Sequence, residues 1–493
     1  MSAYNQLVDH FQKISRFQHL SAICGWDQAA VMPSGGSQAR SEAMAELSVH
    51  IHKMLTAEKL GEWFEQTESM QLSKIESASV REMRRQWSLA TVLPEALVEA
   101  KSLAGAKCEH AWRTQRIDND WQGFANNWKA VVALSQEEAQ IRAEATGKKP
   151  YDAMLDLYEP GVSTTQLNSL FESVKTWLPD LINQVVEKQS TESCVLPSGQ
   201  FSSSKQKALG LDAMALLQFD FNHGRLDESV HPFCGGVPSD VRITTRYSDQ
   251  EFVQSLMGIV HETGHAKYEQ GLPKTLHGLP AGEARSMGIH ESQSLFFEMQ
   301  VGRSTAFIEH LSRLAKKHFT ECSDDLLSTE NFAKLYTRVK KDFIRVDADE
   351  VTYPAHVMLR FEIERDLING DIGFNDVPDV WDDKMKAYLG LSTKGNYKNG
   401  CMQDIHWTDG SFGYFPSYTL GAMYAAQFMS SMKKVVDVDD AIRSGDLSPI
   451  FAWLSKNIWS HGSLLTTDEL VTQATGEALN SDHFKAHLMA RYL

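Results

Sequence analysis

Residues 252–265 read Phe-Val-Gln-Ser-Leu-Met-Gly-Ile-Val-His-Glu-Thr-Gly-His, an apolar run that ends in an HExxH motif. The run is typical of a helix, and Gly271 and Pro273 follow it as a helix stop. Residues four apart lie one above the other on a helix. The stretch therefore predicts a helix with His261 and His265 on one face.

Two imidazoles on one helix face can bind a single Zn²⁺ ion. Glu262 leaves the helix sideways, where it can hold a water molecule instead of the metal. This is the arrangement of a metallopeptidase, in which the metal acidifies a water and the glutamate receives its proton. HExxH also occurs by chance on solvated helices, but this copy lies in a strongly helical stretch. Gly264 costs a helix about 1 kcal/mol relative to alanine, which is tolerable if another element approaches that face closely.

The composition bounds the class of protein. A chain of 493 residues can bury a large core, and on length alone it could hold two to three domains. Hydrophobic residues make up 42% and charged residues 23%, as in globular proteins. The net charge is −16 and no block is rich in Lys or Arg, so we expect no nucleic-acid partner.

The cysteines and the first residues bear on the compartment. Six cysteines are scattered without a CxxC pair, which fits a reducing compartment and argues against a disulfide framework. The first segment, 1–11, reads as an amphipathic helix and not as a signal peptide. No stretch approaches the roughly 20 apolar residues that span a bilayer. We expect a cytoplasmic protein without a membrane partner.

Helical periodicity dominates the chain. Segments with apolar residues three and four apart are 4–23, 37–56, 75–91, 94–118, 121–146, 164–188, 204–216, 250–270, 290–317, 329–343, 352–368, 376–389, 418–432, 437–443 and 446–459. Residues 217–247 differ, because Phe219–Phe221 and Val241–Tyr247 alternate or are rich in β-formers, which predicts a small two- or three-stranded sheet. No repeat or low-complexity linker divides the chain. We expect one all-α, mainly helical domain over 1–493, with a cleft.

A catalytic zinc site has three protein ligands and an open position. The third ligand after two helical histidines is usually a carboxylate from a following helix. The candidates are Glu269, Glu283, Glu291 and Glu298. Glu269 would point along its own helix and Glu283 sits in a loop flanked by glycine. Spacing alone does not choose between Glu291 and Glu298.

Further motifs run nearly the full length of the chain. They are Trp26-Asp27-Gln28, Met32-Pro33, Gly35-Gly36, Tyr151-Asp152-Ala153, Tyr158-Glu159-Pro160-Gly161, His231-Pro232-Phe233, Asp240-Val241-Arg242-Ile243-Thr244, His290-Glu291-Ser292-Gln293, Ile344-Arg345-Val346-Asp347-Ala348-Asp349, Gly400-Cys401-Met402-Gln403-Asp404-Ile405-His406-Trp407 and Gly413-Tyr414-Phe415-Pro416-Ser417-Tyr418-Thr419-Leu420-Gly421. In this order, together with HExxH, they closely resemble the M32 metallocarboxypeptidases.

The resemblance implies several properties. Glu291 would be the third metal ligand. The fold would be mainly helical with a deep substrate groove, similar to neurolysin and angiotensin-converting enzyme, with a small sheet beside the active site. The protein would be a homodimer that removes single C-terminal residues from peptides. Its preference for the residue removed would be broad, but peptides that end in proline would be poor substrates. Zn²⁺ would be the metal, and Co²⁺ can support activity in relatives. One departure is Pro354, which we expect to kink its helix.

A carboxypeptidase must recognise a free α-carboxylate, which arginine pairs with best. Arg242 and Arg345 lie in motifs of the family, although both could instead form structural ion pairs with nearby acids. His406, Tyr414 and Tyr418 are candidate donors to the oxyanion of the scissile carbonyl, or packing residues of an aromatic loop. The resemblance to the converting-enzyme segment favours Tyr414, with Tyr418 close behind.

Two other functions compete with this interpretation. An oligopeptidase or dipeptidyl carboxypeptidase would use the same HExxH chemistry and release longer products. A non-catalytic helical binding protein with a decayed metal site is a rival from another class. Intact His261, Glu262, His265 and Glu291 argue against the second rival.

Overall fold

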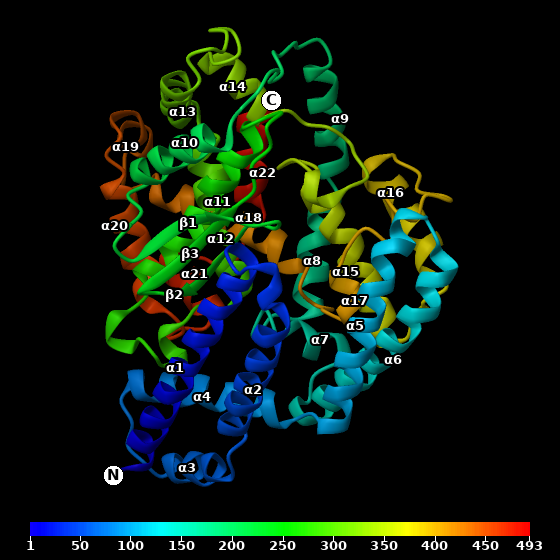
Figure 1. Ribbon diagram of the computed structural model, residues 1–493, viewed down its shortest axis with the longest axis vertical. Coiled ribbons are helices and arrows are strands. Elements are labelled where there is room, and N and C mark those ends of the chain that lie inside the picture. Colours follow the sequence, from blue (N-terminus) through cyan, green and yellow to red (C-terminus); the bar gives the residue numbers. More distant parts are fainter.

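The computed structural model describes residues 1–493 and is 67% helical, with one three-stranded sheet, so the predicted fold class is confirmed. The helices in chain order are α1 (Ala3–Ala30), α2 (Ser37–Leu55), α3 (Glu58–Glu68), α4 (Lys74–Thr91), α5 (Glu95–Ile117), α6 (Trp121–Thr146), α7 (Pro150–Leu155), α8 (Thr164–Lys175), α9 (Leu178–Gln189), α10 (Ser203–Leu216), α11 (Val253–Gly271), α12 (Met287–Leu295), α13 (Thr305–His318), α14 (Thr329–Tyr336), α15 (Tyr353–Asn369), α16 (Val377–Leu389), α17 (His406–Asp409), α18 (Pro416–Met432), α19 (Val438–Ser444), α20 (Ser448–Asn457), α21 (Thr467–Thr475) and α22 (Asp482–Tyr492). Figure 1 shows α1 to α4 grouped at one end, and α5, α6 and α15 to α17 on the side away from the sheet.

The small sheet directly precedes α11, as predicted. Its strands are β1 (Gly224–Glu228), β2 (Phe233–Val237) and β3 (Asp240–Thr245), in the order β1-β3-β2. β1 runs parallel to β3 and β2 runs antiparallel to it. Alternate residues of β3, such as Val241 and Ile243, are buried in one apolar cluster with Ile259 of α11. The sheet therefore packs on the helix that carries HExxH, and β2 forms an edge.

Several element boundaries differ from the sequence-based expectation. The segment 164–188 is two helices, α8 and α9, because Pro179 lies in the first turn of α9 and starts a new helix. The segment 290–317 is divided by a π-helical turn, Phe296–Gly302. Phe219–Phe221 belongs to no strand. Pro354 does not kink α15, since it occupies the first turn, where no intrahelical N–H bond is needed.

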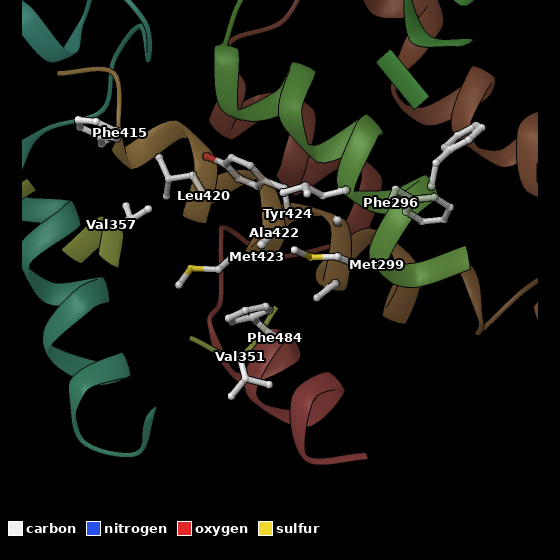
Figure 2. Packing of buried hydrophobic residues seen from close by; sticks show 14 of the residues in the cluster. Phe296, Met299, Val351, Val357, Phe415, Leu420, Ala422, Met423, Tyr424 and Phe484 are labelled. Carbon is white, nitrogen blue, oxygen red and sulfur yellow. The ribbon is translucent and has the colours of Figure 1, made fainter. Parts of the chain in front are cut away.

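The main core surrounds α18. This helix is buried over almost its whole length, including Leu420, Met423 and Tyr424. Figure 2 shows these side chains in one hydrophobic cluster with residues from distant parts of the chain, among them Phe296 and Phe484. A helix without a polar face belongs in the centre of a large domain. α18 therefore holds the C-terminal motif residues rigidly against α12 and α15.

The N-terminal helices have a smaller core of their own. Leu7 and Phe11 of α1 pack with Phe64 of α3 and Met83 of α4. α2 buries no residue fully. No helix is both long and apolar enough to cross a membrane.

Candidate metal centre and groove

Three of the predicted residues meet at one point. His261 and His265 project from α11, and Glu291 comes from α12. One possible ligand atom from each lies within 4.8 Å of the others, and His265 Nε2 is 3.5 Å from Glu291 Oε2. Two imidazoles and one carboxylate are the donor set of a catalytic Zn²⁺ site. A Zn²⁺ ion held by these three residues would keep its fourth position for water or substrate.

Two glycines allow the helices to approach this closely. A Cβ on Gly264 would lie 2.5 Å from the carbonyl oxygen of Gln293 and 2.7 Å from Cα of Ser294, both on α12. A Cβ on Gly421 of α18 would lie 2.7 Å from Cγ of Glu291. Gly264 was expected to admit a close neighbour, and the neighbour is the helix of the third carboxylate. The position of Glu291 thus depends on missing side chains on both sides.

Substitution of Gly264 by alanine tests this packing. Gly264→Ala is expected to destabilise the protein by about 1–3 kcal/mol, as for other overpacked cores. Gly258→Ala on the same helix is the control, because its Cβ would meet nothing within 4 Å. That control should be neutral or stabilising by up to about 1 kcal/mol, since alanine favours the helix. Thermal unfolding of both variants measures the difference, and equal midpoints would contradict the packing argument.

Both histidines are oriented by a hydrogen bond from Nδ1. His261 Nδ1 donates to Glu298 Oε2 at 2.8 Å, and Arg303 donates to the other oxygen of Glu298 at 2.5 Å. His265 Nδ1 shares a 2.7 Å hydrogen bond with His290 Nδ1, whose own Nε2 donates to Glu269 at 2.8 Å. Such partners fix the tautomer that leaves Nε2 for a metal.

These contacts separate the four glutamates that the sequence offered. Glu298 and Glu269 support the histidines from behind, and Glu283 is bonded to Gln86 at 3.4 Å instead. Although burial opposes it, Arg303 and His261 lower the pKa of Glu298 to about 2. Only Glu291 joins the histidine pair. His290 links His265 to Glu269.

The cluster opens into a cavity of about 610 Å³. Glu262, Arg345, Tyr414 and Tyr418 all line it, together with the three candidate ligands. Burial raises the pKa of Glu262 to about 7. A carboxylate with this pKa is well matched to accepting a proton near neutral pH.

An aromatic cluster from residues 406–418 lies beside the cavity. Tyr414 and Tyr418 pack edge to face, with ring centroids 5.2 Å apart. His406 does not line the cavity of the metal cluster; it stacks on Tyr414 at 5.5 Å and lines a neighbouring cavity. Burial lowers the pKa of His406 to about 4, so its ring is neutral at physiological pH.

The two candidate arginines lie in different surroundings. Arg345 is buried, with Nε bonded to Asp404 at 3.0 Å and Nη1 bonded to the Tyr353 hydroxyl at 2.6 Å. Its remaining nitrogen, Nη2, makes no hydrogen bond within the chain and is not a buried orphan. Arg345 lines both the cavity of the metal cluster and the neighbouring cavity.

Arg242 does not line the cavity of the metal cluster. It forms a bidentate ion pair with Asp240, with N–O distances of 2.6 and 2.9 Å. Its guanidinium carbon lies 4.4 Å from the centroid of the Trp26 ring. This is the structural ion pair that the sequence left open as its alternative role. Tyr353, which holds Arg345, was missed by sequence reasoning. It sits at the first turn of α15, and neither spacing nor composition marks it.

Comparisons with known proteins identify the family. A family model described as carboxypeptidase Taq (M32) metallopeptidase matches residues 6–492. The chain belongs to the M32 family. Thermostable carboxypeptidase 1 of Thermus thermophilus is 36% identical, with 100% of this chain and 98% of the relative covered. Carboxypeptidase 1 of Bacillus subtilis is 33% identical over 99% of this chain and 97% of its own.

Solved structures of the family have the same fold. Metallocarboxypeptidase 1 of Trypanosoma cruzi matches with a TM-score of 0.97 at 48% identity, covering 99% of each chain. The Pyrococcus furiosus carboxypeptidase, described as Apo-Mg, matches with a TM-score of 0.95 at 31% identity, covering 100% of this chain and 99% of that one. The M32 chain described here is accordingly a metallocarboxypeptidase that acts on peptides with a divalent metal.

Proposed function

We propose that this M32 enzyme is a zinc carboxypeptidase that removes single residues from peptides with a free C-terminus. Its preference for the residue removed is broad, and peptides that end in proline are poor substrates. The observation that carries the proposal is that Arg345 lines the same cavity as the metal cluster and has one nitrogen, Nη2, that is not bonded within the chain. A guanidinium with one unpaired nitrogen suits a terminal carboxylate. The preference for residue type follows from the family resemblance alone.

The donor set supports Zn²⁺ as the metal. His261 and His265 each have Nδ1 engaged in a hydrogen bond, which leaves Nε2 of each ring for an ion. His-His-Glu favours zinc over the hard cations, which prefer oxygen ligands. Co²⁺ is expected to substitute. When bound, the ion would polarise the scissile carbonyl and acidify a water molecule.

The side chains of the groove then divide the remaining work. Glu262, beside the cluster, holds the attacking water and accepts its proton. Tyr418 and Tyr414 face the cavity with hydroxyl groups that can donate to the developing oxyanion; burial raises the pKa of Tyr414 to about 12, so that hydroxyl keeps its proton. His406 supports Tyr414 by stacking. Arg345 binds the terminal carboxylate and so places the last peptide bond at the metal.

Removal of the third ligand tests the metal site. Glu291→Ala is expected to lose metal during dialysis against a mild chelator, because a direct ligand is gone. Glu298→Ala should lose less, since it removes only the partner of His261, and such partners are worth about 10- to 100-fold in metal affinity. Metal content is measured in both variants. Equal losses would contradict the assignment of Glu291.

Product length separates the proposal from its rival. An oligopeptidase or dipeptidyl carboxypeptidase would release internal fragments or dipeptides from a blocked peptide. Mass spectrometry of a peptide ladder, after incubation with metal-loaded enzyme, should instead show steps of one residue.

We further propose a single domain over 1–493, a cytoplasmic location and a homodimer. The absence of any disulfide among the six cysteines supports the location.

A further inference from the structure

A buried carboxylate, Asp404, pairs with the arginine that lines the groove, Arg345. Asp404 accepts from Arg345 Nε at 3.0 Å with one oxygen and from Arg360 Nε at 2.6 Å with the other. The three residues are each 5% exposed or less. The two guanidiniums lower the pKa of Asp404 well below its usual range, against the effect of burial. Arg360 comes from α15 and reaches neither cavity lining.

The charges in this cluster do not cancel. Two guanidiniums share one carboxylate, so one positive charge is left over. The neighbouring groups offer no second anion in direct contact. His356 has neither ring nitrogen bonded, and burial lowers its pKa to about 3, so it is neutral. Glu364, one turn along α15 from Arg360, is bonded to Tyr151, Trp407 and the Gly413 amide instead.

Besides its ion pair with Asp404, Arg360 donates from Nη1 to the His356 carbonyl oxygen at 2.7 Å, but it is not fully satisfied. Its Nη2 is buried without any hydrogen-bond partner, and its guanidinium stacks 4.6 Å from Trp381 and 5.4 Å from Phe415. Burying such a group is costly, and an apolar replacement is often neutral or stabilising. A single arginine on Asp404 would have formed a neutral pair. That pair would have left Arg345 with no net charge to offer the groove.

We propose that Arg360 is a positioning residue for recognition of the peptide's terminal carboxylate. Arg360 pairs with one carboxylate oxygen of Asp404, so the cluster around Arg345 keeps a net charge of one positive unit. The other oxygen of Asp404 still orients the Arg345 guanidinium. When the substrate carboxylate binds, the site holds two guanidiniums and two carboxylates, and the charges cancel. This inference rests on the proposed role of Arg345.

Charge-changing variants test the inference in the full-length enzyme. Arg360→Gln keeps a donor toward Asp404 but removes the charge, so KM for a blocked free-acid peptide should rise about tenfold, as for loss of one nearby charge at an intermediate dielectric. The value of kcat should stay within about twofold, because the lost interaction binds substrate and transition state alike. Arg360→Lys should restore most of the affinity. Arg365→Gln, on the same helix but paired with Asp366, is the control and should change neither constant.

The double variant Arg360→Gln with Asp404→Asn supplies the sharpest readout. It restores the net charge to one positive unit, and the new amides can bond to each other, so KM for the free acid should return toward the native value. This rescue also guards against a merely misfolded single variant. An Arg360→Gln enzyme with native KM, or a double variant as poor as the single one, would overturn the inference. Arg345→Ala is run alongside; if its preference for free acid over amide is unchanged, the proposed function of Arg345 fails instead.

Discussion

Glu262→Gln is expected to reduce kcat about a thousandfold, within the range that general-base catalysis contributes. The amide has nearly the shape of the carboxylate but cannot accept the proton of the attacking water. Both histidines and Glu291 are untouched, so the metal content should equal that of the native enzyme. Turnover of a free-acid peptide and metal content are measured on the same preparations. Near-native turnover would remove Glu262 from the mechanism.

The same variant should not be less stable than the native protein. Burial raises the pKa of Glu262 in the folded state to about 7, above its value in the unfolded chain. A carboxyl group shifted in this direction destabilises the fold at every pH above the unfolded pKa, because ionisation is harder in the folded state. The neutral glutamine escapes that cost. Chelator-treated Glu262→Gln should therefore unfold at the same or a higher temperature than chelator-treated native protein at pH 8, which separates lost chemistry from lost folding.

Much of the site could be predicted because its parts are local. The HExxH motif alone predicts how its two histidines are placed, since a helix puts residues four apart on one face. The carboxylate is harder, because α11 and α12 meet through tertiary packing. Glu291 and Glu298 are both on the segment after HExxH, and the π-helical turn that begins at Phe296 sets the direction of Glu298. Periodicity carries no signal for such a turn, and the family resemblance chose Glu291 instead.

The same limit applies to the arginines and to the fold. The expected single helix over 290–317 hid the turn, and α21 and α22 near the C-terminus were not expected at all. Arg242 and Arg345 both stand in motifs beside acids, so sequence gives them equal rank. Their difference lies in the tertiary structure. Asp240 pairs with Arg242 from two positions back, outside the cavity of the metal cluster, whereas Arg345 pairs with the distant Asp404 and lines that cavity.

Loss of Arg345 should change which peptides the enzyme prefers. Arg345→Ala leaves a substrate carboxylate without its partner in a partly desolvated groove, which costs about 2–5 kcal/mol for a truncated buried charge pair. That loss should appear in kcat/KM for peptides with a free C-terminus. C-terminally amidated peptides lack the charge, so they should be poor substrates of the native enzyme and lose little more in the variant.

Arg242→Ala is the matched control for this experiment. Its guanidinium already has two of its three nitrogens on Asp240 and a face on Trp26, and it does not line the cavity of the metal cluster, so its removal should disturb local packing alone. Any effect should fall equally on matched free-acid and amide peptides. The ratio of kcat/KM between acid and amide is therefore the decisive quantity, because misfolding or metal loss cancels in it. If Arg345→Ala keeps the native ratio, the arginine does not read the terminus and is a structural ion pair with Asp404.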